Sequence, residues 1–176
     1  MDRLTEILNT LSPFFSSFQI ISTTHDRGHF EGELKLDNPH CDYRFSRTAN
    51  VTLTLNPNGF VEQMPVVKVN ELWMHKSADW HCYQDGSICW ELEERWKSKL
   101  AEIRSQNPPQ GDFLKFAITW CLESSICLIS RHWYAHTNNI TEWPKEWKYW
   151  AHGPEGKKDY ERGKRKHERK KSKRTH

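Results

Sequence analysis

The residues best suited to covalent chemistry lie in the segment HCYQDGSICW, residues 81–90. Its Asp-Gly pair predicts a tight turn, because glycine adopts a positive φ at little cost. The turn places Cys89 just ahead of a helix expected from about Glu91, where the positive end of the helix dipole would favour a thiolate. His81, eight residues before the cysteine, can fold back across the turn to donate a hydrogen bond to an oxyanion or to act as a base. The pattern indicates nucleophilic thiol chemistry at Cys89.

Packing and turn formation are the simpler alternatives for the same residues. A lone cysteine beside isoleucine and tryptophan is often a small buried hydrophobe. His81 could equally brace the loop by bonding backbone groups. Asp85 fits a turn former better than a base, and His75 fits a surface residue. The spacing alone leaves both roles open for Cys89 and for His81.

The cysteine count favours reduced thiols. There are five cysteines, an odd number, and no Cys-x-x-Cys pair, whereas a secreted disulfide framework usually has an even count in a shorter chain. Cys82, Cys121 and Cys127 fit packing roles, the last two on one apolar helix. Reduced thiols in a cytoplasm are therefore expected.

A zinc site is the alternative of another class. His75, His81, Cys82 and Cys89 are four possible ligands within fifteen residues. Structural zinc sites, however, favour ligands paired two to four residues apart, and the His-x-Glu and Pro-Cys-x-x-Cys motifs of zinc deaminases are absent. We therefore expect no metal and no other cofactor.

The elements that must position Cys89 follow from hydrophobic periodicity. The sequence predicts an α+β fold, with one N-terminal helix, a four-stranded antiparallel meander and C-terminal helices. The strand containing Val51, Leu53 and Leu55 alternates most clearly. The chain predicts a helix at 2–11, strands near 17–24, 29–36, 43–55 and 66–69, an irregular loop at 71–90, helices at 91–105 and 112–134, and an aromatic segment from 143.

Length and composition fit one domain with a tail. The chain has 176 residues, 36% of them hydrophobic and 28% charged, and its nine Trp and eight Phe would fill much of the core. The longest apolar runs, such as 126–129, are too short to span a bilayer, and the N-terminus does not look like a signal peptide. A cytoplasmic protein that does not enter a membrane is expected.

The charge is divided unevenly between domain and tail. Residues 155–176 hold eleven Lys/Arg and four Asp/Glu, a net charge of +7 within a total of +3, so the preceding residues carry −4. We expect a domain at 1–153 and a basic tail at 154–176 that is flexible or helical. A solvated end is favoured over a nucleic-acid or partner patch, partly because the domain is acidic.

The order of these elements, with Gly-x-x-Cys after a long loop, resembles the ubiquitin-conjugating fold. Residues 86–89, Gly-Ser-Ile-Cys, match the cysteine part of the eukaryotic signature, and Trp96 follows seven residues after the cysteine. The His-Pro-Asn triplet of that signature is absent, and His81 stands where the Asn would be.

Bacterial relatives are the better match. Their pattern His-x-Tyr-x-Asp-Gly-x-x-Cys is satisfied from His81 to Cys89, and their Trp-rich helix, Trp-Pro segment and following His are similar to residues 133–144 and His152. The resemblance covers residues 1–153, although only 79–96 is motif-specific. It points to the bacterial ubiquitin-conjugating-like proteins of antiphage operons.

The resemblance implies that Cys89 carries the C-terminal carboxyl group of a protein as a thioester and passes it to an amine. It implies His81 as the stabiliser of the oxyanion in place of Asn. The implied cargo is a cGAS-like nucleotidyltransferase of a type II CBASS system or, as the alternative, a ubiquitin-like protein. The chain has no Gly-rich nucleotide loop, so a separate adenylating enzyme would activate the cargo, unless the operon lacks one. A non-catalytic interaction module is the remaining alternative.

Overall fold

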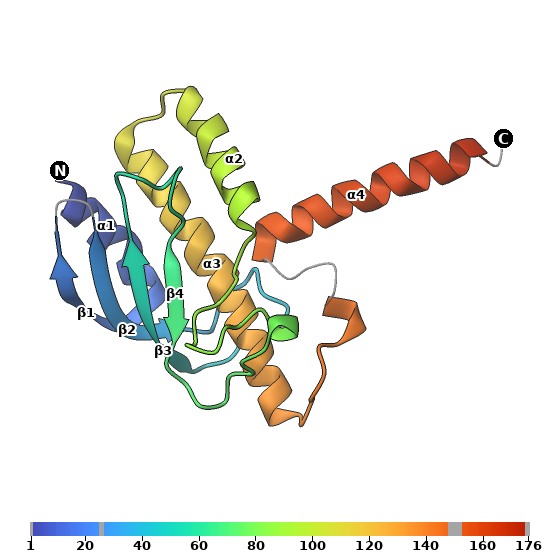
Figure 1. Ribbon diagram of the computed structural model, residues 1–176, viewed down its shortest axis with the longest axis horizontal. Coiled ribbons are helices and arrows are strands. Elements are labelled where there is room, and N and C mark those ends of the chain that lie inside the picture. Colours follow the sequence, from blue (N-terminus) through green and yellow to red (C-terminus); the bar gives the residue numbers. More distant parts are fainter. Residues whose placement is uncertain (1, 25–26, 148–152, 175–176) are drawn as a thin grey trace.

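The computed structural model describes residues 2–24, 27–147 and 153–174. Within these residues the fold is α+β, with an N-terminal helix, a four-stranded sheet and C-terminal helices, as predicted (Figure 1). The α-helices are α1 (Arg3–Leu11), α2 (Glu93–Ser105), α3 (Gln110–Thr137) and α4 (Gly153–Arg174). The strands are β1 (Phe15–Thr23), β2 (Gly28–Lys35), β3 (Thr48–Leu55) and β4 (Val66–Val69). Short 3-10 turns cover Ser12–Phe14, Ala78–Trp80 and Lys145–Trp147.

The strands form one antiparallel sheet in the order β1-β2-β3-β4, so each strand pairs with its neighbour in the sequence. The alternation predicted for β3 is confirmed, because Val51, Leu53 and Leu55 are all buried. These side chains join a single core with residues of α1, α2 and α3. The sheet and α3 therefore form the two main layers of the fold.

The third strand is shorter than the sequence predicts. It begins at Thr48 instead of residue 43, and residues 36–47 form a loop in which Leu36 N donates to Arg47 O at 3.0 Å. The side chain of Asn38 accepts a hydrogen bond from His40 N at 2.9 Å. An Asn-Pro turn of this kind interrupts strand pairing, because proline has no N–H to donate.

This loop carries Cys41, which forms a disulfide with Cys127 of α3. The prediction of reduced thiols, with Cys127 serving only packing, is therefore wrong for this pair. The two cysteines are 86 residues apart, and their Cα atoms lie 5.0 Å apart. Sequence spacing gives no sign of such a contact, because the tertiary fold creates it. Cys82 and Cys121 are free and buried, in agreement with packing roles.

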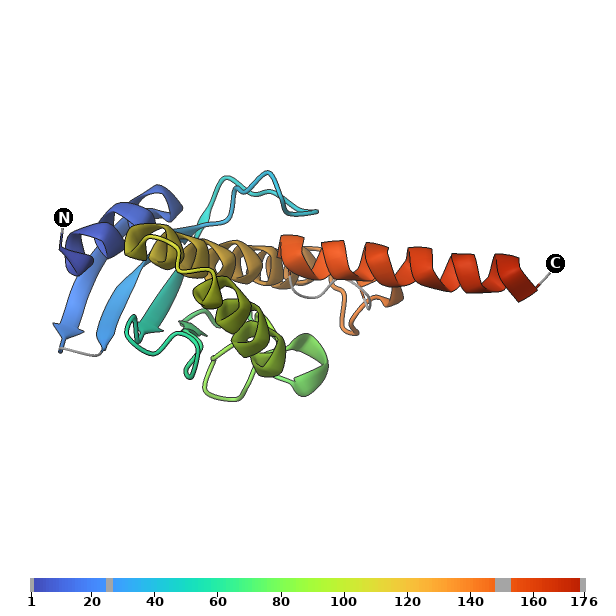
Figure 2. The same ribbon diagram turned by 90° about the horizontal axis from the view of Figure 1, so that it is seen from above.

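α3 runs through the middle of the molecule, beside α1 and α2 (Figures 1 and 2). It is long and apolar enough to cross a membrane, which the short apolar runs of the sequence did not suggest. However, 78% of its most apolar window is buried inside the fold. Its apolar surface therefore serves the core of this domain.

The basic tail is helical where the structure describes it. The beginning of α4 contacts α3, and the rest of α4 extends away from the body of the molecule (Figures 1 and 2). The predicted aromatic segment contains the turn Lys145–Trp147, and Trp147 is buried. His152, which follows the Trp-Pro segment, lies outside the described residues.

Candidate functional site

The turn ahead of Cys89 is built by Asp85 and Gly86, as predicted. The carboxylate of Asp85 accepts hydrogen bonds from Ser87 N at 2.9 Å and from Ser87 Oγ at 2.6 Å. Gly86 has φ of 90°, and a Cβ at this position would lie 2.7 Å from the carbonyl oxygen of Val69. Only glycine satisfies both the backbone conformation and the close approach.

Residues 86–88 then run antiparallel to β4. Val69 N donates to Gly86 O at 2.8 Å, and Ile88 N donates to Val67 O at 3.0 Å. The loop thus gains a short sheet-like pairing, although the sequence predicts no periodicity there. This pairing fixes Cys89 at the edge of the sheet.

Cys89 lies in a groove of about 370 Å³. All five cysteines are described, and among the three free ones Cys89 alone is not fully buried. The rim carries three exposed apolar side chains, Val66, Tyr83 and Leu92. We call this the Cys89 groove; it is lined by Met64, Pro65, Val66, Tyr83, Ser87, Ile88, Cys89, Trp90, Glu91, Leu92 and Glu93.

The thiol is held in its neutral form. Burial raises the pKa of Cys89, and the negative charge of Glu91 raises it further. The thiol donates to Glu91 O at 3.5 Å. The expectation that a helix N-terminus favours the thiolate is wrong here, because α2 begins only at Glu93 and acidic side chains, including Glu91, gather at its start.

Glu91 is a site residue that the sequence analysis missed. It is 2% exposed, and its carboxylate accepts from Leu92 N at 2.8 Å and from Arg95 at 2.6 Å. The signal was present, because Glu91 and Arg95 are four residues apart at the start of a helix, the spacing of a helical ion pair. The bonds fix the carboxylate near the thiol.

Two buried tryptophans support the residues that form the groove. Trp90 Nε1 donates to Pro65 O at 3.1 Å, and Trp96 Nε1 donates to Phe60 O at 2.6 Å. Their rings meet edge to face at 5.1 Å. Trp96, which the family resemblance singled out, therefore anchors α2 against the loop before β4.

The backbone of His81 contacts the backbone of Cys89. The carbonyl of His81 accepts from Cys89 N at 2.8 Å, so the two residues do meet across the turn. The imidazole ring packs against Trp143, with ring centroids 5.0 Å apart. Burial lowers the pKa of His81, and the positive charge of Arg131 lowers it further. The imidazole is therefore neutral at neutral pH and retains one N–H donor.

The backbone conformation of His81 is also unusual. Its φ of 54° places it in the left-handed region, which is uncommon for residues other than glycine, although asparagine, aspartate and histidine occupy it more often than the rest. The hydrogen bond from Cys89 N helps to hold it there. The backbone at His81 is thus fixed by the same contact that joins it to the thiol residue.

α3 supports the loop that carries His81. The ring of His132 is fully buried; its Nδ1 accepts from His75 N at 3.0 Å, and its Nε2 donates to Trp80 O at 2.9 Å. These two bonds define a neutral tautomer. Burial lowers the pKa of His132 to about 3. The ring is therefore a fixed neutral link between α3 and residues 75–80.

Arg131, the neighbour of His132 on α3, organises the aromatic segment. Its guanidinium binds Asp42 at 3.1 Å and lies over the rings of Trp143 and Trp147 at 5.8 and 5.4 Å. It thereby holds Trp143 against His81. Neither Arg131 nor His132 was predicted to support the site, although an Arg-His pair inside an otherwise apolar helix indicates buried groups with defined partners.

The four candidate zinc ligands are not gathered around one point. His75 is only half-buried, in agreement with its predicted place at the surface, but its ring stacks on Trp80 with centroids 3.9 Å apart. Burial raises the pKa of Cys82 to about 11. Across the residues that the structure describes, no three His, Cys, Asp or Glu side chains come close enough to hold a metal ion.

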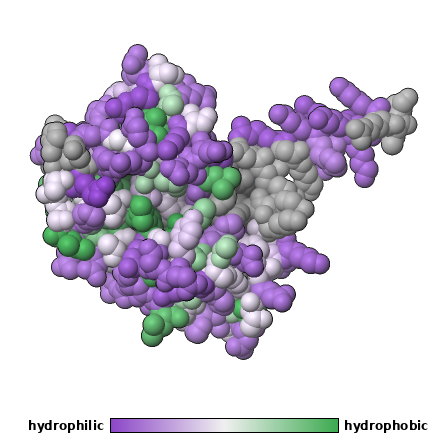
Figure 3. Space-filling view, in the orientation of Figure 1, coloured by the Kyte–Doolittle hydropathy of each residue, from purple (hydrophilic) through white to green (hydrophobic). Residues whose placement is uncertain are grey.

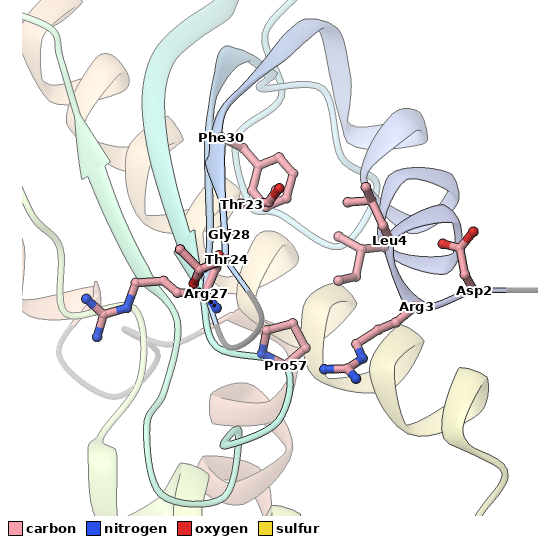
Figure 4. Close-up of a pocket in the computed structure, with 10 residues that line it drawn as sticks. Asp2, Arg3, Leu4, Thr23, Thr24, Arg27, Gly28, Phe30 and Pro57 are labelled. Carbon is pink, nitrogen blue, oxygen red and sulfur yellow. Dashed lines mark hydrogen bonds between the residues drawn. The ribbon is translucent and has the colours of Figure 1, made fainter.

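A second hollow lies between α1 and the β1–β2 end of the sheet (Figure 4). Leu4 of α1 and Phe30 of β2 lie on opposite sides of it (Figure 4). None of its lining residues is a cysteine or a histidine. The Cys89 groove is therefore the better candidate for covalent chemistry than this hollow.

Comparison with protein-family models, with curated proteins and with solved structures finds no match for this chain.

Proposed function

We propose that this protein is a thioester-forming conjugating enzyme with a ubiquitin-conjugating-like fold. Cys89 would accept the C-terminal carboxyl group of a protein and pass it to an amine. The observation that carries the proposal is a partly exposed free thiol in a groove with an apolar rim. The order of helix, four-stranded meander, cysteine loop and helices agrees with that fold.

The groove suits an extended peptide end. Its walls come from residues 64–66, which lead into β4, from Tyr83, and from residues 87–93, which include Cys89. Val66, Tyr83 and Leu92 are 48%, 61% and 56% exposed, so they offer apolar contacts to a partner. A C-terminal carboxyl group placed in the groove would meet the thiol directly.

The chemistry proceeds in two acyl transfers. Cys89 loses its proton to water, its sulfur attacks the carbonyl carbon of the acyl adenylate, and AMP leaves as the C–S bond forms. An amine then attacks the thioester carbonyl, the C–S bond breaks, and the thiolate regains a proton. We propose that the neutral imidazole of His81 turns toward the groove during the reaction and donates its N–H to the oxyanion of either step; in the structure the ring packs against Trp143, and His81 is not among the residues that line the groove.

A raised pKa suits a carrier cysteine. A neutral thiol reacts slowly with stray electrophiles, since the thiolate is the nucleophile. Once deprotonated, a more basic thiolate is intrinsically more nucleophilic, and it is a poorer leaving group. The burial of Cys89 and the charge of Glu91 would therefore limit side reactions before loading and slow loss of the cargo to water afterwards.

The proposed cargo is a cGAS-like nucleotidyltransferase of a type II CBASS antiphage system, activated by a separate adenylating enzyme in the cytoplasm. A bacterial ubiquitin-like protein is the alternative cargo. Both offer a C-terminal carboxyl group, so both would use the same groove and the same cysteine.

The test is adduct formation with each candidate cargo, its adenylating enzyme and ATP, followed on non-reducing gels. Wild-type protein should give an adduct that thiols cleave, and Cys89→Ser should give an ester that resists thiols and is cleaved by base. Cys82→Ser is the matched control and should behave like wild type. An unchanged adduct with Cys89→Ala would overturn the proposal.

His81 needs its own pair of variants. Asparagine tolerates the left-handed backbone and carries an amide donor, so His81→Asn should retain most of the transfer rate. His81→Ala removes the donor and should slow transfer by about 10²-fold or more if the oxyanion role is correct. Equal rates for His81→Ala and wild type would reduce His81 to a brace of the loop.

A further inference from the structure

The outer part of α4 is a strongly basic helix that leaves the body of the protein. Residues 162–174 contain nine Lys/Arg and one Glu. Figures 1 and 2 agree that this part of the helix extends away from the sheet and from α3. In Figure 3 its described atoms are hydrophilic throughout. It therefore presents charge to the solvent at a distance from the Cys89 groove.

The charges are not spread evenly around the helix. Six of them recur at intervals of three and four residues, the spacing that puts side chains on one side of a helix. All six side chains are exposed. At a rise of 1.5 Å per residue they cover about 17 Å of the helix. This basic stripe consists of Arg162, Arg165, Lys166, Arg169, Lys170 and Lys173.

The same stretch lacks the groups that other partners require. Residues 161–174 contain no Phe, Trp or Tyr and no aliphatic side chain. Protein interfaces depend on apolar or aromatic anchors at their centre, and a helix that lies in a membrane interface needs an apolar face. Charge is the only recognition chemistry that the stripe offers.

The stripe also repels itself. Like charges three and four residues apart destabilise a helix by about 0.2–0.5 kcal/mol per pair, and Figures 1 and 2 show the described part of the outer helix running clear of the body. A partner that supplies regularly spaced negative charges would relieve the repulsion along its whole length. The phosphate backbone of a nucleic acid has this property, with one charge per about 1.7 Å of duplex axis.

We propose that the basic stripe of α4 binds the phosphate backbone of double-stranded nucleic acid without sequence preference. The acidic body, with its net charge of −4 over residues 1–154, is repelled by the same polyanion. Contact is therefore confined to the projecting helix, and the Cys89 groove stays accessible. The tail is a nucleic-acid anchor, in contrast to the solvated end that its composition alone favours. This inference does not depend on the chemistry of Cys89.

The test is a salt titration of the full-length protein with a fluorescently labelled duplex of arbitrary sequence, followed by anisotropy. If all six stripe charges contact phosphates, the logarithm of the association constant should fall with log[salt] at a slope of about −5. Duplexes of different sequence should give the same slope. A slope shallower than about −2 would overturn the proposal.

Two adjacent lysines provide a matched pair of variants. Lys170 lies on the stripe and Lys171 lies off it, and glutamine has nearly the same helix propensity as lysine. Lys170→Gln should reduce the slope by about 0.9 and weaken binding about eightfold at 0.1 M salt, whereas Lys171→Gln should change binding by no more than about twofold. Equal losses would refute a one-sided stripe.

Other polyanions define the remaining outcomes. Vesicles with 30% anionic phospholipid and an acidic protein fragment are compared with the duplex at the same salt concentration. Tighter binding of either than of the duplex would overturn the assignment to nucleic acid. The triple variant Arg165→Gln, Arg169→Gln, Lys173→Gln should lose at least about 10²-fold in duplex affinity, and its alkylation at Cys89 should remain as in wild type, which shows that the body is intact.

Discussion

Acid should destabilise this protein through a buried histidine. His132 is fully buried, and burial lowers its pKa from 6.5 to about 3. In the unfolded chain the ring has its ordinary pKa of about 6.5. Between these values the unfolded state binds a proton that the native state does not, so the free energy of unfolding decreases as the pH falls. The stability that the neutral ring provides is complete above pH 6.5 and is lost progressively toward pH 3.

The magnitude follows from the two pKa values. Proton linkage for this single ring gives a loss of about 2 kcal/mol between pH 7 and pH 5. The figure hardly changes for any native pKa below about 4, because at pH 5 the native ring is then still neutral. A loss of this size is a large part of the stability of a typical domain.

The assay is urea unfolding at pH 7 and pH 5 for wild type and for His132→Gln. Glutamine has a comparable N–H for the carbonyl of Trp80 but does not titrate. The variant is expected to be less stable at pH 7 by about 1–3 kcal/mol, since His75 N loses its acceptor. Its further loss on going to pH 5 should be about 2 kcal/mol smaller than that of wild type.

The other histidines with lowered pKa, His75 and His81, add to the acid sensitivity of both proteins, so the measured quantity is the difference between the two losses of stability. If wild type and variant lose the same stability between pH 7 and pH 5, the ring of His132 is not a buried neutral group, and the reasoning fails.

Three further outcomes follow from the geometry. Cys89 should react with iodoacetamide at pH 7.5 more slowly than a cysteine in an unfolded peptide, and Glu91→Gln should speed the reaction by lowering the pKa of the thiol. Mass spectrometry measures both alkylation rates, and a rate that is already independent of pH below pH 8 would contradict the raised pKa. Gly86→Ala should cost about 1–3 kcal/mol in chemical unfolding because of its positive φ and close backbone contact, while Gly59→Ala, whose nearest neighbour is a side chain, should cost less. A reducing agent should lower the unfolding free energy by about 4 kcal/mol, as expected for a disulfide closing a loop of 86 residues; Cys41→Ser should remove this sensitivity.

The secondary structure was largely predictable because its signals are local. The alternation of Val51, Leu53 and Leu55 gives the face of β3 directly. Leu4, Ile7 and Leu11 give α1, which the structure places at Arg3–Leu11. The position of the chemistry-bearing loop also follows from local patterning, because periodicity stops after Val69 and resumes only at α2.

The electrostatics of the site were not predictable in the same way. The effect of the helix start on Cys89 was predicted with the wrong sign, because the sequence does not show how deeply the thiol is buried or that Glu91 is buried beside it. The disulfide of Cys41 and the link from His132 to residues 75–80 are contacts between distant segments. They arise from the packing of α3 and leave no periodic signal in the sequence.

Cys89 and His81 are held by different parts of the fold, so the reactivity of the thiol and the proposed stabilisation of the oxyanion can be altered separately. Residues 86–88 pair with β4, so Cys89 is fixed to the sheet. His81 belongs to the segment that His132 ties to α3, and this segment pairs with residues 87–89 through the hydrogen bonds from Cys89 N to His81 O and from Tyr83 N to Ser87 O, both of 2.8 Å. Because each part has buried contacts of its own, loss of the ring at His132 displaces His81 more than Cys89. His132→Gln should therefore leave the alkylation rate of Cys89 near wild type at pH 7 while slowing acyl transfer, and a parallel loss of both would show that the site moves as one unit.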